Sequence, residues 1–384
     1  MFRFLLILSM TLWGTAGASE RLDSGVLKVG PRHAVKTLAE ASKVAVNGMT
    51  IEVDAGDYLK DVAVWTQSDL KFLAVGGRVR LIASGAHVEG KGTWVLRGGG
   101  VSVEGFDFVG ARVPDRNGAG IRLEKGSLTV TDCTFTDNEN GILTANNAEI
   151  VLEITRSEFG YNGAGDGQSH NLYVGSIKQL IVTGTYFHHA KVGHLLKSRA
   201  AENHIRYNRL VDGEGGNASY ELEFPAGGIA YVVGNVIEQA PGTGNPHLIA
   251  FGAEGYKWPR NELYLVNNTL IDRRASEGVF LRVKPNAQVI AAGNNLLLGK
   301  GKLDTAGPGD YQNNFNVDSS EFAMAPPEPY RLKASSRLVG KMIDPATANG
   351  FNLSPGFEFS SPRGMKPVSS KSRQPGAVQT LGAR

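Results

Sequence analysis

A six-residue pattern of apolar and polar positions recurs along the middle of the chain. Each copy has an apolar or β-branched residue, two further residues, a small or polar residue, one further residue and a large apolar one. The copies end at Phe108, Phe135, Phe159, Phe187, Leu210, Ile237 and Leu270, and a degenerate copy ends at Leu296. The spacings between these ends are 27, 24, 28, 23, 27, 33 and 26 residues. A nearly constant period of this length is typical of a solenoid, in which each repeat forms one rung.

A second strand-like segment lies between successive copies of the pattern. Examples are residues 120–123, 141–144, 171–174 and 220–224. Alternating positions in such segments place one set of side chains inside and the next set outside. Several short strands in each turn, with glycine and asparagine at the corners, predict an all-β fold, a right-handed parallel β-helix. The main alternative is a β-sandwich, but that fold would show hairpin turns every 8–12 residues or so and no constant period.

Asparagines stand at the same place in successive copies, at Asn208, Asn235 and Asn268. Asparagine side chains satisfy backbone groups at corners, and they stack as ladders when they repeat from rung to rung. We therefore expect these three residues to be structural.

The two ends of the solenoid differ from its middle. Residues 35–46 have helical apolar spacing, which predicts a cap helix over the open N-terminal end. The β-helix domain with this cap spans residues 19–302. The period fades at about residue 303, and residues 303–384 are rich in proline, serine and glycine. We expect them to form an irregular wrapping segment with a disordered end.

The first residues, 1–18, resemble a cleavable signal peptide. Arg3 is followed by an apolar run at residues 4–13, which is too short to cross a bilayer, and then by Ala16-Gly17-Ala18. This predicts a periplasmic or secreted protein. Cys133 is the single cysteine, so no disulfide within the chain is possible.

The overall charge is nearly balanced, with 40 basic and 37 acidic residues and a formal net charge of +3. This balance gives no argument for a nucleic acid partner or an anionic membrane. We expect a monomer with no membrane association. Hydrophobic residues make up 41% of the chain, which is enough for a large core.

Polar residues that can do chemistry gather between residues 170 and 224. Five of the eight histidines lie there, at His170, His188, His189, His194 and His204. A step of ten residues to the next copy of the pattern aligns Leu172, Leu195 and Leu222 as inward-facing residues. Their outward neighbours are then Asn171, His194 and Glu221 in one column, and Tyr173, Leu196 and Glu223 in the next. Adjacent rungs are about 4.8 Å apart.

Lys197 and Arg199 follow at the end of the same strand, so basic and acidic groups converge on one wall. That inventory suits β-elimination from a uronic-acid polysaccharide, which needs a neutralised sugar carboxylate, a base and an acid. Arg199 can pair with the carboxylate, and Lys197 or His194 can take the proton. Tyr173 or a histidine can act as the acid.

Glu221 and Glu223 can orient the base or hold a calcium ion, so calcium stays open as a cofactor. The remaining candidates are for substrate binding, at His170, Asn171, His188 and His189. A further binding patch is predicted in the loop behind the 33-residue spacing, at Tyr256, Trp258 and Arg260. Aromatic residues in such a loop can stack on sugars, and the alternative of equal weight is that Trp258 packs the loop on the wall.

The segments 30–58 and 329–377, together with the rungs between them, resemble right-handed parallel β-helix proteins of the pectate-lyase-like superfamily. The stretch Lys197-Ser-Arg-Ala-Ala-Glu-Asn203-x4-Asn208 is similar to the Lys-Ser-x-x-Asn-x4-Asn stretch of the chondroitinase B and alginate lyase family, with two extra residues here. The resemblance implies that Lys197 is the base. It does not extend to that family's calcium-binding acids, since Val192 and His194 precede Lys197.

Several functions remain open at this stage. The first is a polysaccharide lyase acting on an acidic polysaccharide. The second is a glycoside hydrolase with Glu221 and Glu223 as acid and base, which stand about 6.5–7 Å apart on one strand, near the inverting range. The third is a C5 epimerase, and the fourth is a carbohydrate-binding β-helix protein without catalytic activity.

Overall fold

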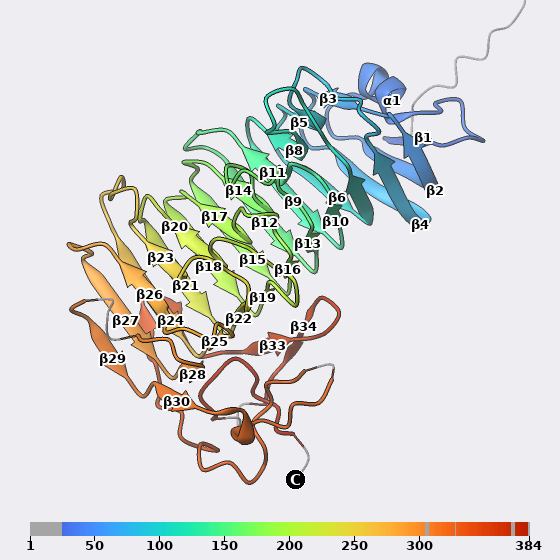
Figure 1. Ribbon diagram of the computed structural model, residues 1–384. Coiled ribbons are helices and arrows are strands. Elements are labelled where there is room, and N and C mark those ends of the chain that lie inside the picture. The colour runs from blue at the N-terminus through green and yellow to red at the C-terminus, as the bar shows by residue number, and fades with distance from the viewer. Residues whose placement is uncertain (1–24, 304–306, 327, 370–372, 383–384) are drawn as a thin grey trace, which may run out of the picture.

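The computed structural model describes residues 25–303, 307–326, 328–369 and 373–382. The predicted signal peptide, residues 1–18, lies outside this described part. Strands stack rung upon rung along one axis, from β1 at the N-terminal end to β30 (Figure 1). The predicted parallel β-helix is therefore confirmed.

The smaller sheet forms one face of the solenoid and has nine strands, all paired in parallel. Its strands in spatial order are β3 (Ala63–Trp65), β5 (Gly92–Leu96), β8 (Ala119–Leu123), β11 (Asn140–Thr144), β14 (Leu172–Val174), β17 (Leu196–Ser198), β20 (Leu222–Phe224), β23 (His247–Phe251) and β26 (Val279–Val283). Each of these strands belongs to one rung.

The larger sheet has 21 strands and consists of two runs that join at β4. The first run is β1 (Val26–Val29), β2 (Thr50–Leu59), β4 (Lys71–Ile82), β6 (Val101–Glu104), β9 (Ser127–Thr131), β12 (Val151–Thr155), β15 (Gln179–Thr183), β18 (Glu202–Arg206), β21 (Ile229–Val233), β24 (Glu262–Val266), β27 (Val289–Gly293) and β29 (Asp310–Gln312). The second run is β7 (Phe106–Val109), β10 (Thr134–Thr136), β13 (Glu158–Gly160), β16 (Tyr186–His188), β19 (Arg209–Val211), β22 (Val236–Gln239), β25 (Thr269–Asp272), β28 (Leu296–Leu298) and β30 (Phe315–Val317).

The interior is built from columns of like residues. Phe108, Phe135, Phe159 and Phe187 stack on one another, with ring centroids 5.0, 4.6 and 5.0 Å apart and nearly parallel planes. All four are fully buried. These are the last residues of four copies of the sequence pattern, so its large apolar position marks the core.

The asparagine ladder lies at a buried corner, as expected. The backbone N–H of Asn208 donates to the side-chain oxygen of Asn235, and the backbone N–H of Asn235 donates in the same way to Asn268. Both N···O distances are 2.9 Å. Asn295 and Asn314 continue the series. Because each amide also donates to a backbone carbonyl, the ladder satisfies the polar groups of the corner.

The N-terminal end is covered by α1 (Leu38–Val44), which confirms the predicted cap helix. Thr37 and Glu40 form a capping box at its first turn. Asp61, from the following rung, accepts hydrogen bonds from the backbone N–H groups of Leu38 and Ala39 at 2.7 and 2.8 Å. Leu38 and Ala41 are buried against the first rungs.

Beyond residue 303, β29 and β30 add one more partial rung. The chain then forms a short 3-10 helix, η2 (Ser319–Glu321), and two small hairpins, β31 (Thr347–Ala348) with β32 (Phe351–Asn352) and β33 (Phe357–Phe359) with β34 (Met365–Pro367). This segment runs back along the larger sheet, where Asn349 donates to the Tyr231 hydroxyl and the Gly364 N–H donates to the Gly184 carbonyl.

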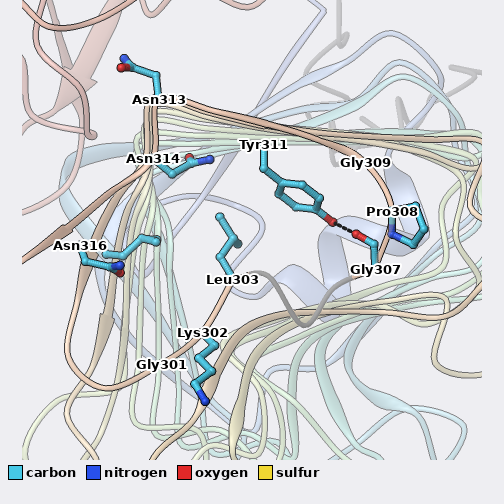
Figure 2. A pocket seen from close by; sticks show the side chains of 11 residues that line it. Gly301, Lys302, Leu303, Gly307, Pro308, Gly309, Tyr311, Asn313, Asn314 and Asn316 are labelled. Atoms are coloured by element: carbon cyan, nitrogen blue, oxygen red, sulfur yellow. Dashed lines mark hydrogen bonds between the residues drawn. The ribbon is translucent and has the colours of Figure 1, made fainter.

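A pocket of about 690 Å³ lies at the C-terminal end of the solenoid, beside the last rung. Figure 2 shows Tyr311 lying across it, with its hydroxyl donating to the carbonyl of Gly307. Within the described ranges, no helix is long and apolar enough to cross a membrane.

Candidate functional site

The register of the smaller sheet differs by one residue from the sequence alignment. Leu196, not Leu195, pairs with Leu172 on one side and with Leu222 on the other. The predicted inward series Leu172, Leu195 and Leu222 is therefore wrong. The connection from Leu196 to Ile205 is nine residues long, whereas the corresponding step from Leu172 to Val182 is ten.

The correction brings the key side chains closer together than the sequence alignment did. Tyr173 of β14, Lys197 of β17 and Glu223 of β20 occupy matching positions on consecutive rungs. Leu143 and Arg122 hold the same position on the two preceding rungs. We call these five residues the outer column, with neighbours about 4.8 Å apart along the solenoid axis.

Glu223 is the negative centre of this part of the wall. Its Oε2 lies 2.9 Å from Nε2 of His194 and 3.2 Å from Nζ of Lys197. Burial raises the pKa of Glu223, but these two neighbours more than offset burial, so its pKa is below the ordinary value. Burial lowers the pKa of His194, and Glu223 compensates only in part. These directions favour a carboxylate at Glu223 beside a neutral imidazole at His194 at neutral pH.

Glu254 is a functional candidate that sequence reasoning missed. Its Oε1 lies 3.2 Å from Nζ of Lys197, and its two oxygens accept from Nε and Nη2 of Arg199 at 2.9 and 2.7 Å. The signal was present in the sequence, since Glu254 lies in the loop behind the 33-residue spacing. That loop is held on the wall because Trp258 donates its indole N–H to the carbonyl of Arg199.

Tyr173 faces both cations of the site. The guanidinium of Arg199 lies 5.3 Å from the centroid of its ring, and Nζ of Lys197 lies 5.9 Å away. On its other side the ring meets the edge of His170 at 4.6 Å. Both cations therefore lie within cation–π distance of this ring.

His170 lies behind the outer column and not on the surface. It is 1% exposed, stacks on His194 at 4.4 Å, and its Nδ1 accepts the backbone N–H of His194. Burial lowers the pKa of His170 well below the ordinary value, and the nearby cations lower it further. Its place fits a residue that positions His194 and Tyr173.

Two predicted outward residues turn out to be interior. Asn171 is fully buried in a second asparagine ladder, where its side-chain oxygen accepts from Asn162 and its amide donates to the carbonyl of His188. Glu221 is also fully buried, one residue before the paired Leu222, and within the described chain neither of its oxygens has a hydrogen-bond partner. Burial raises the pKa of Glu221 well above the ordinary value.

Several other predicted residues lie elsewhere on the molecule. His188 ends β16 in the larger sheet, with its Nδ1 2.9 Å from that of His189 and its Nε2 3.3 Å from Glu158. His204 also lies in that sheet. Arg260 is bound to Glu262 and to Asn349 of the C-terminal segment. Tyr256 donates its hydroxyl to the carbonyl of Lys284.

A groove of about 560 Å³ runs beside the outer column, over the rungs of β8, β11, β14 and β17. Its polar lining includes Arg122, Asn140, Thr144, Asn146, Tyr173 and Arg199. Ala145 and Gly175 also line the groove, and the small size of these two residues leaves its space open. The larger pocket in Figure 2 shares none of these lining residues.

The carboxylates at the site do not fit a calcium ion as they stand. Calcium takes six to eight oxygen ligands or so, and it favours carboxylates and carbonyls. Both Glu223 and Glu254 direct their oxygens to Lys197, His194 or Arg199. In the described part of the chain, no group of three or more acidic, histidine or cysteine side chains is arranged to hold a metal ion.

Several solved structures resemble this chain, but their sequence identity to it is low. The chain is 13% identical to the pectate lyase Pel9A, with a TM-score of 0.45 over 85% of this chain and 92% of that one. It is 14% identical to ORF18 of Geobacillus virus E2, with a TM-score of 0.42 over 71% of this chain and 53% of that one. It is 14% identical to the PL6-family alginate lyase AlyGC, with a TM-score of 0.26 over 93% of this chain and 57% of that one.

The chain has a parallel β-helix fold. It spans about half the length of the viral protein and of the alginate lyase. No family model matches the sequence, and no curated protein does. The functional assignment therefore depends on the residues of the site itself.

Proposed function

We propose that the protein is a polysaccharide lyase that cleaves a uronic-acid-containing polysaccharide by β-elimination. The observation that carries this proposal is the meeting of Lys197 with Tyr173 and Arg199, two residues that line a polar groove. A uronate bound there would face a phenol, an ammonium group and a guanidinium group. These are the three kinds of group that the reaction requires.

Arg199 neutralises the sugar carboxylate in this proposal. Glu254 accepts from its Nε and from Nη2, and the Arg199 side chain lines the groove beside Tyr173. Pairing with a guanidinium stabilises the charge that develops on the carboxylate when the neighbouring C5 proton leaves. Glu254 holds the guanidinium in place for this task.

Tyr173 takes the C5 proton, and Lys197 supplies the proton for the leaving oxygen. The C5–H bond breaks, the C4–C5 double bond forms, and the C4–O bond breaks as the oxygen accepts the proton of Lys197. The reaction starts with Tyr173 as a phenolate, whose ring centroid lies within 6 Å of both cations, and it leaves Tyr173 as a neutral phenol. Proton return from Tyr173 to Lys197 through water completes the cycle.

Glu223 and the two buried histidines hold these groups in place. Glu223 fixes Nζ of Lys197, and His194 fixes Glu223. His170 supports both His194 and the ring of Tyr173. We therefore assign positioning roles to these three residues, and we transfer the role of base from Lys197 or His194 to Tyr173. His194 is 6% exposed, which leaves little surface for contact with a sugar.

The hydrolase alternative loses its acid–base pair. Glu221 is fully buried, so it and Glu223 do not flank one substrate bond. The binding-only alternative has one observation in its favour, since Lys197 and Arg199 are both already paired with Glu254.

Our proposal includes export through residues 1–18 and action as a monomer in the periplasm or outside the cell.

The test is the ultraviolet absorbance of the unsaturated product when the mature protein is mixed with a panel of polyuronates. Parallel samples contain calcium or a chelator, and reducing ends are counted in each. We expect absorbance and reducing ends to rise together on at least one polymer. Reducing ends without absorbance would show hydrolysis, and polymer binding without either signal would establish the binding-only function.

A further inference from the structure

Arg122 is partly buried and forms no ion pair in the described chain; burial lowers its pKa, and Glu124 offsets this only in part. Its Nε is buried and has no hydrogen-bond partner in the described chain, and no carboxylate there lies within ion-pair distance of its guanidinium. The nearest acidic residue in sequence, Glu124, is bound to Lys91 and Arg97. Burying part of a guanidinium is costly unless a partner compensates for the lost water.

Asn140 lies in the same groove and also has an unused donor. It is 1% exposed, and its side-chain oxygen accepts the backbone N–H of His170 at 2.9 Å. That bond fixes the orientation of the amide, so its Nδ2 stands on the other side. This nitrogen has no hydrogen-bond partner among the described residues. Buried amide donors normally have partners, and an amide donor without one that lines the same groove as a cation favours an anionic ligand.

The distance between this place and the reacting groups sets the size of the ligand. Arg122 stands two rungs from Tyr173 and three from Lys197 in the outer column. At about 4.8 Å per rung, these separations are roughly 10 and 14 Å along the axis. Both exceed the reach of a single sugar carboxylate, and the groove is continuous between them.

We infer that Arg122 and Asn140 form a second carboxylate-binding subsite, which holds another uronate of the chain that is cleaved at Tyr173. This inference rests on the proposed function and deepens it. The substrate is then a polymer with carboxylates on sugars along one stretch, lying in the groove along the solenoid axis. A polymer with isolated uronates between neutral sugars fills only one of the two subsites.

The experiment is calorimetric titration with galacturonate and mannuronate oligomers from dimer to hexamer. The proteins are the wild type, Arg122→Ala and Arg122→Gln, with thermal unfolding to show that each is folded. Arg282→Ala is the matched control, because Arg282 is an exposed arginine at the same position of the smaller sheet, three rungs beyond Lys197 and outside the groove. Arg122→Lys tests whether charge alone suffices.

We expect the affinity of the wild type to rise once the oligomer is long enough to reach both subsites. Arg122→Ala and Arg122→Gln should lose this rise, about 10-fold or more for a charge-assisted contact, and Arg282→Ala should keep it. Oligomers with reduced carboxyl groups should not show it in any protein. Equal affinities of wild type and both Arg122 variants for all lengths would overturn the inference.

The outcomes separate the subsite from the proposed function. If binding depends on oligomer length and on Arg122 but no unsaturated product forms, the subsite is supported and the lyase function is wrong. If unsaturated product forms and KM is unchanged in both Arg122 variants, the lyase function is supported and the subsite is wrong. A sulfated polymer that competes as well as a polyuronate would contradict the choice of carboxylate as the ligand group.

Discussion

Two kinds of column run along this solenoid, and they differ in how their residues change from rung to rung. The interior columns repeat one residue type, as in the phenylalanine stack and the asparagine ladder. The outer column changes at every rung, from arginine through leucine, tyrosine and lysine to glutamate. Repetition satisfies the fold because each residue meets the same neighbours, whereas a change at every rung places different chemical groups side by side.

The comparison predicts that substitutions in the outer column alter activity and those in the interior columns alter stability. The Tyr173→Phe substitution should have the largest effect on activity. Loss of the hydroxyl that takes the proton should lower kcat by about 10²- to 10⁴-fold, with KM and the unfolding temperature nearly unchanged. Steady-state kinetics on the best polyuronate provides the measurement. Tyr161→Phe, on an exposed tyrosine beside His189, is the control and should keep full activity.

The asparagine ladder should show the opposite behaviour. Asn235→Ala leaves the backbone N–H of Asn208 and the carbonyl of Ile205 without their partners in a buried corner. We expect a loss of about 3 kcal/mol in the free energy of unfolding, measured by urea denaturation. Asn316→Ala, at an exposed position of β30, should cost almost nothing. A ladder variant as stable as the wild type would break the comparison.

Glu221 is an exception to the interior rule, since it is a buried carboxyl group without a hydrogen-bond partner in the described chain. Its raised pKa means that its contribution to stability is fully present below the ordinary value and is lost as the pH rises through the folded value. Glu221→Leu should therefore stabilise the protein at pH 7, by about 1–3 kcal/mol, and have little effect near pH 4. Urea denaturation at both pH values tests this. Destabilisation at pH 7 would mean that the carboxylate has a partner.

The buried histidines behind the outer column give the smallest effect. The pKa values of His170 and His194 are lowered, so their contribution is present above about pH 6.5 and is lost as the pH falls below it. The unfolding temperature should decrease between pH 7 and pH 5, and His170→Asn should reduce that decrease. The expected difference is about 1 kcal/mol. An identical pH profile for the variant would assign the change to other groups.

The sequence predicted the interior far better than the outer wall. Phe108, Phe135 and Asn235 recur with the period, so their positions follow from repetition. The wall was misaligned by one residue because the turn after Leu196 is one residue shorter than its neighbours, and a pleated strand changes face at every residue. Glu221 was expected to face outward, but it lies just before β20, so the alternation of faces along a strand does not apply to it.

Glu254 and Arg122 illustrate a second limit of sequence reasoning. Glu254 reaches Lys197 and Arg199 from an insertion more than 50 residues away, and nothing in the period specifies where that loop returns. Arg122 lies two rungs before the histidine-rich region. It is therefore far along the chain from the other site residues, and residue clustering in the sequence does not reveal it. Contacts between rungs depend on register, which the sequence leaves uncertain by one residue.

The most direct measurement is mass spectrometry of the oligosaccharides that the wild type and Tyr173→Phe release from the same polyuronate. We predict that the wild type releases products with an unsaturated end, lighter by one water than hydrolysis products, and that Tyr173→Phe releases almost none. Saturated products from the wild type, or equal amounts of unsaturated product from both proteins, would contradict a lyase with Tyr173 as its base.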